Sequence, residues 1–205
     1  MLVLAALAAA LLAYMLVHAT RPAQTNPADW QAPASDPWRA YLAPDSACPG
    51  AGDYLAPAAA QKRAMICLVD YARTRYGSLH RGWPGRGPLP ENALLTRAGT
   101  LKSALLLRCD QFTHYPCKTP FATVFREAGY GRGAPVVSVG ENLAYGQQDE
   151  GSPRATLDGW LNSPEHRQNL FTAKWRAQGL ALAHPQAFVG YSDVTLWVSE
   201  FGNVS

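Results

Sequence analysis

The sequence reads VGENLAYG at residues 139–146, WLNSPEHRQNL at residues 160–170 and WVSEFG at residues 197–202, and these stretches decide the fold. In each of them, polar residues interrupt an apolar or glycine-containing background. Glu141 lies in the first stretch, His166 in the second, and His114 in an earlier segment, FTHY, at residues 112–115. Titratable side chains in apolar surroundings are candidates for a functional site.

The chain around these stretches shows mainly helical periodicity. Apolar residues at helical spacing predict a helix over residues 65–76, ended by Gly77, and a second helix over residues 94–109. Three shorter helices are predicted where a Ser or Thr N-cap precedes a proline at the first helical position, at Thr119-Pro120, Ser152-Pro153 and Ser163-Pro164.

Strand signals are fewer, and they cover residues 136–139, 179–183 and 194–201. We expect the last two strands to form an antiparallel pair. Since helices outnumber strands and separate the first strand from the others, the pattern predicts an α+β layer structure.

The order and spacing of the three opening stretches resemble the bacterial secreted type of the CAP (SCP-like) superfamily, which includes cysteine-rich secretory protein, antigen 5 and pathogenesis-related-1. The resemblance spans residues 58–203. It implies an α-β-α sandwich with a small, mostly antiparallel sheet between helices, and a central groove lined by histidines and acids.

The resemblance also implies that His114, Glu141 and His166 converge in that groove. Two neutral imidazoles and one carboxylate are a plausible ligand set for zinc or a similar divalent cation, with one position left for water. The alternative is a hydrogen-bonded polar core without a metal, in which Glu141 accepts a hydrogen bond from a histidine.

Other residues of the motifs are expected to support the groove. Asn142 would brace its loop, and Asn169 would do the same for the turn that carries His166. In the better-known eukaryotic pattern a second groove acid follows the helix tryptophan by three residues, and that position is Ser163 here. Glu165 is expected to interact with a helix dipole rather than to act in catalysis.

Four cysteines follow an apolar leader, which indicates two disulfides and an oxidising compartment. Cys109 and Cys117 are close in sequence, so we expect them to pair, and their bond would stabilise the fold by roughly 2 to 3 kcal/mol. By elimination, Cys48 pairs with Cys67.

The chain is expected to have three parts. Residues 1–19 form an export signal peptide or a membrane anchor. Residues 20–57 form a proline-rich tether whose second half packs on the domain as a strap, because Trp38, Tyr41 and Leu42 are too apolar for a solvated linker. Residues 58–205 form the CAP (SCP-like) domain. This organisation predicts a secreted, periplasmic or cell-envelope protein.

Composition excludes some functions. Among 205 residues the net charge is only +3 and the basic residues are scattered, which argues against a nucleic-acid partner. No His-Glu-x-x-His, Gly-x-Ser-x-Gly or Walker motif occurs, so the sequence favours a protein that is not an enzyme.

Three functions remain. The first is an exported, non-catalytic module that binds a divalent cation, a lipid-like apolar molecule or an envelope component. The second is a metal-dependent hydrolase acting on peptides or cell-wall material, with His114 and His166 as ligands and Glu141 as ligand or general base. The third is a structural platform for protein partners.

Overall fold

A computed structural model of the chain describes residues 32–80 and 87–205. At its centre, strand β5 (Val194–Val204) pairs antiparallel with β1 (Val137–Gln147) on one side and with β2 (Ala177–Ala183) on the other. The strand order β1-β5-β2 makes β1 an edge strand. The predicted antiparallel pairing of β2 with β5 is confirmed, and a short hairpin of β3 (Ala187–Phe188) and β4 (Tyr191–Ser192) connects them.

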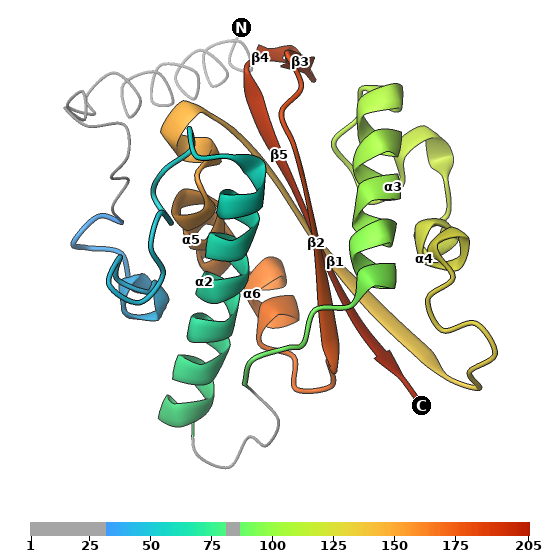
Figure 1. Cartoon of the computed structure of the whole chain (residues 1–205), viewed down its shortest axis with the longest axis horizontal. Coiled ribbons are helices and arrows are strands. Elements are labelled where there is room, and N and C mark those ends of the chain that lie inside the picture. The colour runs from blue at the N-terminus through green and yellow to red at the C-terminus, as the bar shows by residue number, and fades with distance from the viewer. Residues whose placement is uncertain (1–31, 81–86) are drawn as a thin grey trace, which may run out of the picture.

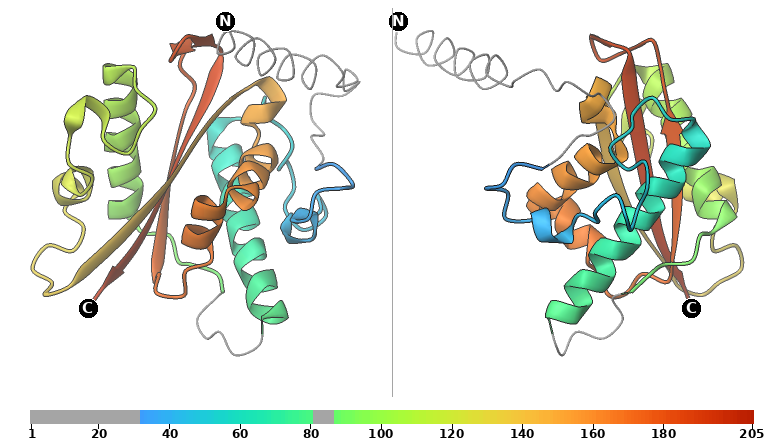
Figure 2. Two further views of the ribbon diagram at one scale, coloured as in Figure 1. Left: turned by 180° about the vertical axis from the view of Figure 1, so that it is seen from behind. Right: turned by 60° about the vertical axis from the view of Figure 1, so that its left-hand side comes forward.

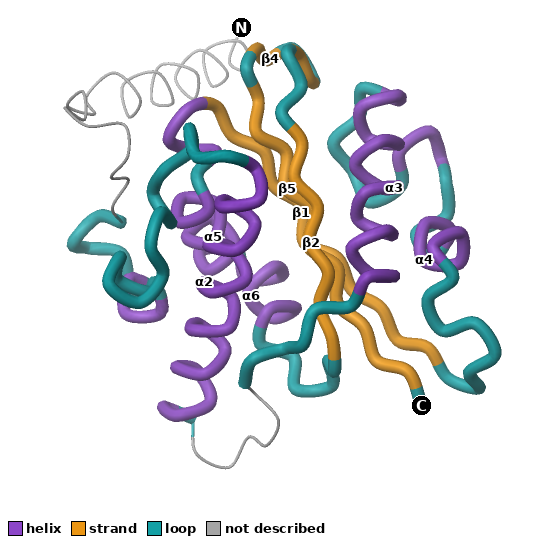
Figure 3. The backbone as a smooth tube through the Cα atoms, in the orientation of Figure 1, coloured by secondary structure: helices purple, strands orange, loops and turns teal. Residues whose placement is uncertain are grey.

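Helices cover both faces of this sheet, as Figures 1 and 2 show. Helices α2 (Ala58–Leu79), α5 (Pro153–Asn162) and α6 (Pro164–Leu170) lie on one face. Helices α3 (Ala93–Cys109) and α4 (Thr123–Ala128) lie on the other, and Figure 3 shows the sheet between the two groups. The expected α+β sandwich with a small antiparallel sheet is confirmed.

The side chains of β5 point alternately to the two faces of the sheet and contribute to a buried core on each face. Trp197 and Phe201 belong to the buried cluster that includes residues of α2 and α5. Leu196 and Val198 point the other way and pack in a cluster with Leu106 of α3. Because both faces are covered, nearly every residue of β5 is buried, and an acid placed there is removed from solvent.

The helix boundaries follow the predicted caps in part. Helix α5 begins as predicted, because Pro153 takes the first helical position and the Ser152 hydroxyl accepts a hydrogen bond from the backbone N–H of Ala155. Ser163 precedes Pro164 at the start of α6, but its side chain makes no capping hydrogen bond. Helix α2 runs two residues past Gly77 to Leu79, since one glycine near a helix end costs only about 1 kcal/mol.

The predicted start of the third helix at Thr119-Pro120 is wrong. Helix α4 begins only at Thr123, and Phe121 and Ala122 form a turn before it. The turn lets the Phe121 ring pack against Phe125 and lie edge-on to His114. Aromatic packing at this position thus takes the place of the first helical turn.

The first predicted strand was too short. Strand β1 does not end at Val139 but pairs with β5 along its whole length to Gln147. Gly140, Glu141 and Asn142 are poor strand formers, which concealed the continuation in the sequence. Cross-strand pairing and burial outweigh that local preference, and they fix both polar residues at defined positions of the sheet.

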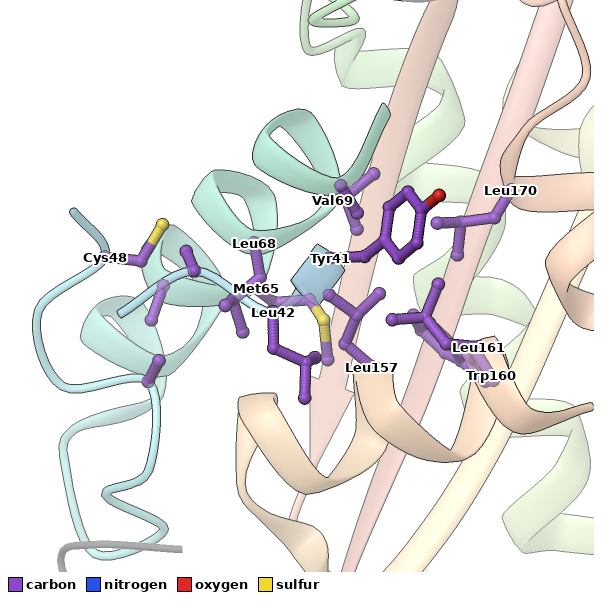
Figure 4. Packing of buried hydrophobic residues seen from close by; sticks show 14 of the residues in the cluster. Tyr41, Leu42, Cys48, Met65, Leu68, Val69, Leu157, Trp160, Leu161 and Leu170 are labelled. Atoms are coloured by element: carbon purple, nitrogen blue, oxygen red, sulfur yellow. The ribbon is translucent and has the colours of Figure 1, made fainter. Parts of the chain in front are cut away.

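The strap packs into the core, as Figure 4 shows. It includes the short 3-10 helix η1 (Arg39–Tyr41), and Tyr41, Leu42 and Ala43 are buried beside residues of α2 and α5. The predicted Cys48–Cys67 disulfide is present and ties the strap to α2. Buried Arg154 of α5 also pairs with Asp45 of the strap.

The predicted leader, residues 1–19, and the first part of the tether, residues 20–31, lie outside the described residues. Within residues 32–80 and 87–205, the structure contains no helix with the length and apolar character needed to cross a bilayer.

Candidate functional site

The residues singled out in the sequence meet in one pocket of about 310 Å³ at the edge strand β1. His114, Glu141 and His166 all line it, although they come from three separate segments of the chain. The other lining residues are Tyr115, Phe121, Gly140, Asn142, Glu165 and Asn169. Ser163 does not line the pocket, because it forms the junction between α5 and α6.

Two consecutive residues of β1 connect the two halves of the pocket. Successive strand residues point to opposite faces of a sheet. The Glu141 side chain turns toward α3 and the loop of His114, whereas the Asn142 side chain turns toward α6 and His166. The pocket can therefore wrap around the sheet edge, with one histidine contributed from each helical layer.

The loop that carries His114 is closed at both ends. The predicted disulfide joins Cys109 at the end of α3 to Cys117, and the two Cα atoms are 5.7 Å apart. The Gln111 side-chain oxygen accepts a hydrogen bond of 2.7 Å from the Cys117 N–H. Lys102 of α3 donates a hydrogen bond of 2.7 Å to the backbone carbonyl of His114. These contacts fix the backbone of the loop.

The imidazole of His114 is oriented by Glu141. Its Nδ1 lies 2.6 Å from Glu141 Oε1, and a carboxylate can only accept, so Nδ1 carries the hydrogen and donates it. The same oxygen lies 3.0 Å from Lys102 Nζ. Glu141 is 0% exposed in its side chain, whereas the His114 side chain is 44% exposed. The free ring nitrogen, Nε2, is consequently the one available to the pocket.

His166 is held through its backbone. Asn142 donates a hydrogen bond of 3.1 Å from Nδ2 to the His166 carbonyl, and Asn169 donates one of 2.9 Å to Asn142 Oδ1. Burial lowers the pKa of His166 below the usual value of 6.5, and the nearby His114 lowers it further, while Glu165 acts in the opposite direction. The burial of the ring therefore favours its neutral form.

Gly140 is required for the close approach of α6 to β1. A Cβ atom at this position would lie 2.6 Å from Asn169 Oδ1 and 2.6 Å from the Trp175 ring. Trp175 in turn donates a hydrogen bond of 2.9 Å to the Asn169 carbonyl. The glycine of the Gly-Glu-Asn sequence thus leaves room for the chain of contacts that reaches His166.

Sequence reasoning missed two buried ionisable residues of the site, Lys102 and Glu200. Lys102 is 1% exposed and Glu200 is 0% exposed. Glu200 of β5 is the direct cross-strand partner of Glu141. Both had a sequence signal. Lys102 falls on the buried stripe of its helix, and Glu200 lies on the same face of its strand as Leu196 and Val198.

Glu200 and Glu141 have unused hydrogen-bonding capacity. Glu141 Oε2 and both oxygens of Glu200 lack a donor group. Burial raises the pKa of Glu200 well above its usual range, the charge of Glu141 and a hydrogen bond with that residue raise it further, and Lys102 lowers it. The two carboxyl groups can be joined only if one of them carries a proton.

The partners of Glu141 bear on the three-residue ligand set expected from the sequence. Glu141 is engaged by Lys102 and His114, so it stands behind His114 instead of facing the pocket alone. Over residues 32–80 and 87–205, no three His, Cys, Asp or Glu side chains are grouped so that they could hold a metal ion. His114 Nε2 and the ring of His166 are the imidazole nitrogen donors that line this pocket.

A second pocket, of about 480 Å³, lies between the strap and α6. Trp38, Tyr76 and Phe171 line it, with the Arg167 guanidinium 4.2 Å above the centre of the Trp38 ring. Tyr76 and Phe171 stack with their ring centres 4.0 Å apart. Three aromatic rings therefore line this pocket, together with polar residues that include Gln168 and Thr172.

Comparison with known proteins shows the fold. No family model and no curated protein matches the sequence. Among solved structures, an outer surface protein from Borrelia burgdorferi is similar over 71% of this chain and 93% of that protein, with a TM-score of 0.54 and 16% identity. An extracellular protein containing an SCP domain, from Bacillus anthracis, has a TM-score of 0.50 and 19% identity over 71% of this chain. The chain spans 43% of that protein's length. The expected CAP (SCP-like) fold is confirmed.

Proposed function

We propose that the protein is an exported, non-catalytic binding module whose pocket at β1 binds a divalent cation through His114 and His166. The observation that carries the proposal is the hydrogen bond from His114 Nδ1 to Glu141. Histidines that bind metals characteristically donate their other ring N–H to a carboxylate, which fixes the tautomer and the ring direction. Glu141 is placed to do this for His114.

The charges of the pocket support a cation over an anion. Glu165 lines the pocket and carries a negative charge, whereas the cationic side chain of the site, Lys102, is buried behind Glu141. His166 is ready to donate its lone pair because its pKa is lowered. Two imidazole donors completed by water suit zinc and copper better than calcium or magnesium, which prefer oxygen ligands.

Export is supported by three observations. Two disulfides form in the described residues, and disulfides persist in oxidising compartments. The apolar leader predicted at residues 1–19 is consistent with passage across a membrane. The similar solved structures are those of an outer surface protein and an extracellular protein. We therefore place the protein in the cell envelope or outside the cell.

Isothermal titration of the full-length protein with zinc tests the cation site. We expect binding in the unaltered protein and its loss in His114→Ala. His80→Ala is the matched control, because His80 stacks on Tyr76 and lies outside the pocket. Glu141→Gln should bind about 10 to 100 times more weakly, as losses of the residue that orients a metal-bound histidine do. Equal affinity in His114→Ala and His80→Ala would refute the proposal.

The hydrolase alternative receives less support from the pocket. None of the described residues that line it is a serine, threonine or cysteine, so a hydrolase at this pocket would need a metal-bound water as its nucleophile. The side chain of Glu141 is also 0% exposed, which removes it from a water molecule or substrate in the pocket that it could deprotonate. Turnover of peptides or glycans that disappears in His114→Ala would favour the hydrolase instead.

An apolar ligand is a second candidate, and the aromatic pocket beside the strap is the feature that favours it. Such a ligand would contact the rings of Trp38, Tyr76 and Phe171, away from the histidines. Binding of a fluorescent fatty acid that is lost in Trp38→Ala and retained in His114→Ala would support this function. Equal binding by both variants would exclude this pocket.

A further inference from the structure

Glu200 is a buried titratable group that the proposed function leaves unused. It lies on the sheet face covered by α3, opposite Glu141 of β1. The neighbouring strand β2 places Gly179, which has no side chain, across from it. From α3, the backbone at Gly99 passes so close that an added Cβ there would lie 3.4 Å from Glu200 Cγ. Lys102 is the charged residue that α3 contributes to the cluster.

One positive charge serves two carboxyl groups in this cluster. Lys102 Nζ lies 3.0 Å from Glu141 Oε1, and it donates a second hydrogen bond to the His114 carbonyl. If Glu141 and Glu200 were both ionised, one negative charge would remain unpaired in the protein interior. Such a charge is strongly unfavourable, and a group in that position takes up a proton instead.

A proton could reside on Glu200, Glu141 or His114. Lys102 Nζ, 3.0 Å from Glu141 Oε1, favours an ionised Glu141, and the hydrogen-bonding atoms distinguish the other two possibilities. With the proton on His114, Glu141 Oε2 and both oxygens of Glu200 would stay without a donor. A proton on Glu200 supplies a donor for Glu141 Oε2 and leaves no unpaired charge. The second arrangement satisfies more buried polar atoms, which is what buried polar clusters normally achieve.

We propose that Glu200 is a positioning residue whose neutral carboxyl group donates a hydrogen bond to Glu141 Oε2. Glu141 is then held at both oxygens, by Lys102 and His114 at Oε1 and by Glu200 at Oε2. It carries a single negative charge balanced by Lys102, and its contact with Nδ1 leaves Nε2 as the ring nitrogen of His114 available to the pocket. This inference concerns the same His114 as the proposed function and rests on it, but its test uses the protein without a ligand.

Infrared spectroscopy of the full-length protein at neutral pH detects the proton directly. We expect a carbonyl band of a protonated carboxylic acid that shifts when glutamate carries a heavy-carbon label in its carboxyl group. The band should vanish in Glu200→Gln and persist in Asp70→Asn, the control for a second partly buried acid whose pKa burial raises. A spectrum without the band, or a band that survives Glu200→Gln, overturns the proposal.

Nitrogen NMR of the His114 ring provides a measurement that would not change if Glu200 had a purely structural role. We expect a neutral ring with its hydrogen on Nδ1 in both the unaltered protein and Glu200→Gln. A cationic ring that becomes neutral only in Glu200→Gln would show that His114 holds the proton, which contradicts the proposal. If Glu200→Gln fails to fold, the absence of the labelled band from the unaltered protein would still overturn the proposal. Neither measurement depends on zinc, so a failure of the cation site is distinguished from a failure of this inference.

Discussion

Lys102 Nζ lies 3.0 Å from Glu141 Oε1, and both side chains are almost completely buried. The pair joins helix α3 to the edge strand β1 behind His114. Removing one partner of a buried ion pair leaves the other charge uncompensated, which is more costly than replacing both.

Lys102→Met should therefore lower the free energy of unfolding by about 3 to 5 kcal/mol. Lys102→Met combined with Glu141→Gln should recover part of this loss, since no unpaired charge remains. Urea denaturation of the four members of this cycle measures the coupling. Losses that simply add in the double variant would show that the two residues do not interact.

Gly140→Ala should disturb the α6 side of the pocket. The added Cβ would collide with Asn169 and Trp175, and overpacking of this kind costs about 1 to 3 kcal/mol. Gly159→Ala is the matched control, because nothing lies within 4 Å of the new Cβ and the residue is inside helix α5. There alanine should stabilise the protein by roughly 0.5 to 1 kcal/mol. Thermal unfolding of both variants compares them, and equal effects would contradict the account.

Removal of the two disulfides should have different effects on the site. Replacing either pair by serine should cost roughly 2 to 3 kcal/mol in stability, since each bond closes a short loop. Only Cys109→Ser with Cys117→Ser should also weaken zinc binding, because His114 lies within that loop. Cys48→Ser with Cys67→Ser loosens the strap and should leave zinc affinity unchanged. Equal zinc affinity in both double variants would show that the disulfide loop does not position His114.

His166 should make stability depend on pH. Its pKa is lower in the folded protein than the usual 6.5, so the unfolded chain binds the proton first as pH falls. The stabilisation is present above about pH 6.5 and is lost as pH falls from there through the folded-state pKa. Glu200 contributes the opposite slope, because its pKa is raised and its contribution is lost as pH rises through the folded value.

Denaturation of the unaltered protein and of His166→Gln at several pH values isolates the histidine contribution. The difference in unfolding free energy between the two proteins should shrink as the pH falls from about 7 to about 5. A difference that stays constant over this range would show that His166 is not held neutral by its surroundings.

Much of the fold could be predicted because its signals are local. The Ser152-Pro153 cap, the apolar stripes of α2 and α3 and the alternation of β5 each depend on short stretches of sequence. The length of β1 could not be predicted in this way, since pairing with β5 overrides the weak strand preference of Gly140, Glu141 and Asn142. The start of α4 differs from the predicted start for a similar reason, because the Phe121 ring contacts His114 of the preceding loop as well as Phe125.

Motifs point to His114, Glu141 and His166 and to the bracing residues Asn142 and Asn169, but not to the buried ionisable residues behind them. His114, Glu141 and His166 stand in motifs, and the structure brings all three to one pocket. Lys102 and Glu200 stand in no motif with an assigned role, and their part in the site depends on the register that places Glu200 opposite Glu141. The proposed roles, with Glu141 orienting His114 and the two imidazoles as donors, likewise depend on distances that no sequence motif encodes.

The most direct test of the central claim is nitrogen NMR of the histidine rings during a zinc titration of the full-length protein. The account predicts that His114 Nε2 and one ring nitrogen of His166 shift together, while His114 Nδ1 keeps its hydrogen and its bond to Glu141. His80 and His184 should not respond. Shifts confined to His80 or His184, or none at His114 and His166, would contradict the claim that the pocket at β1 is a cation site.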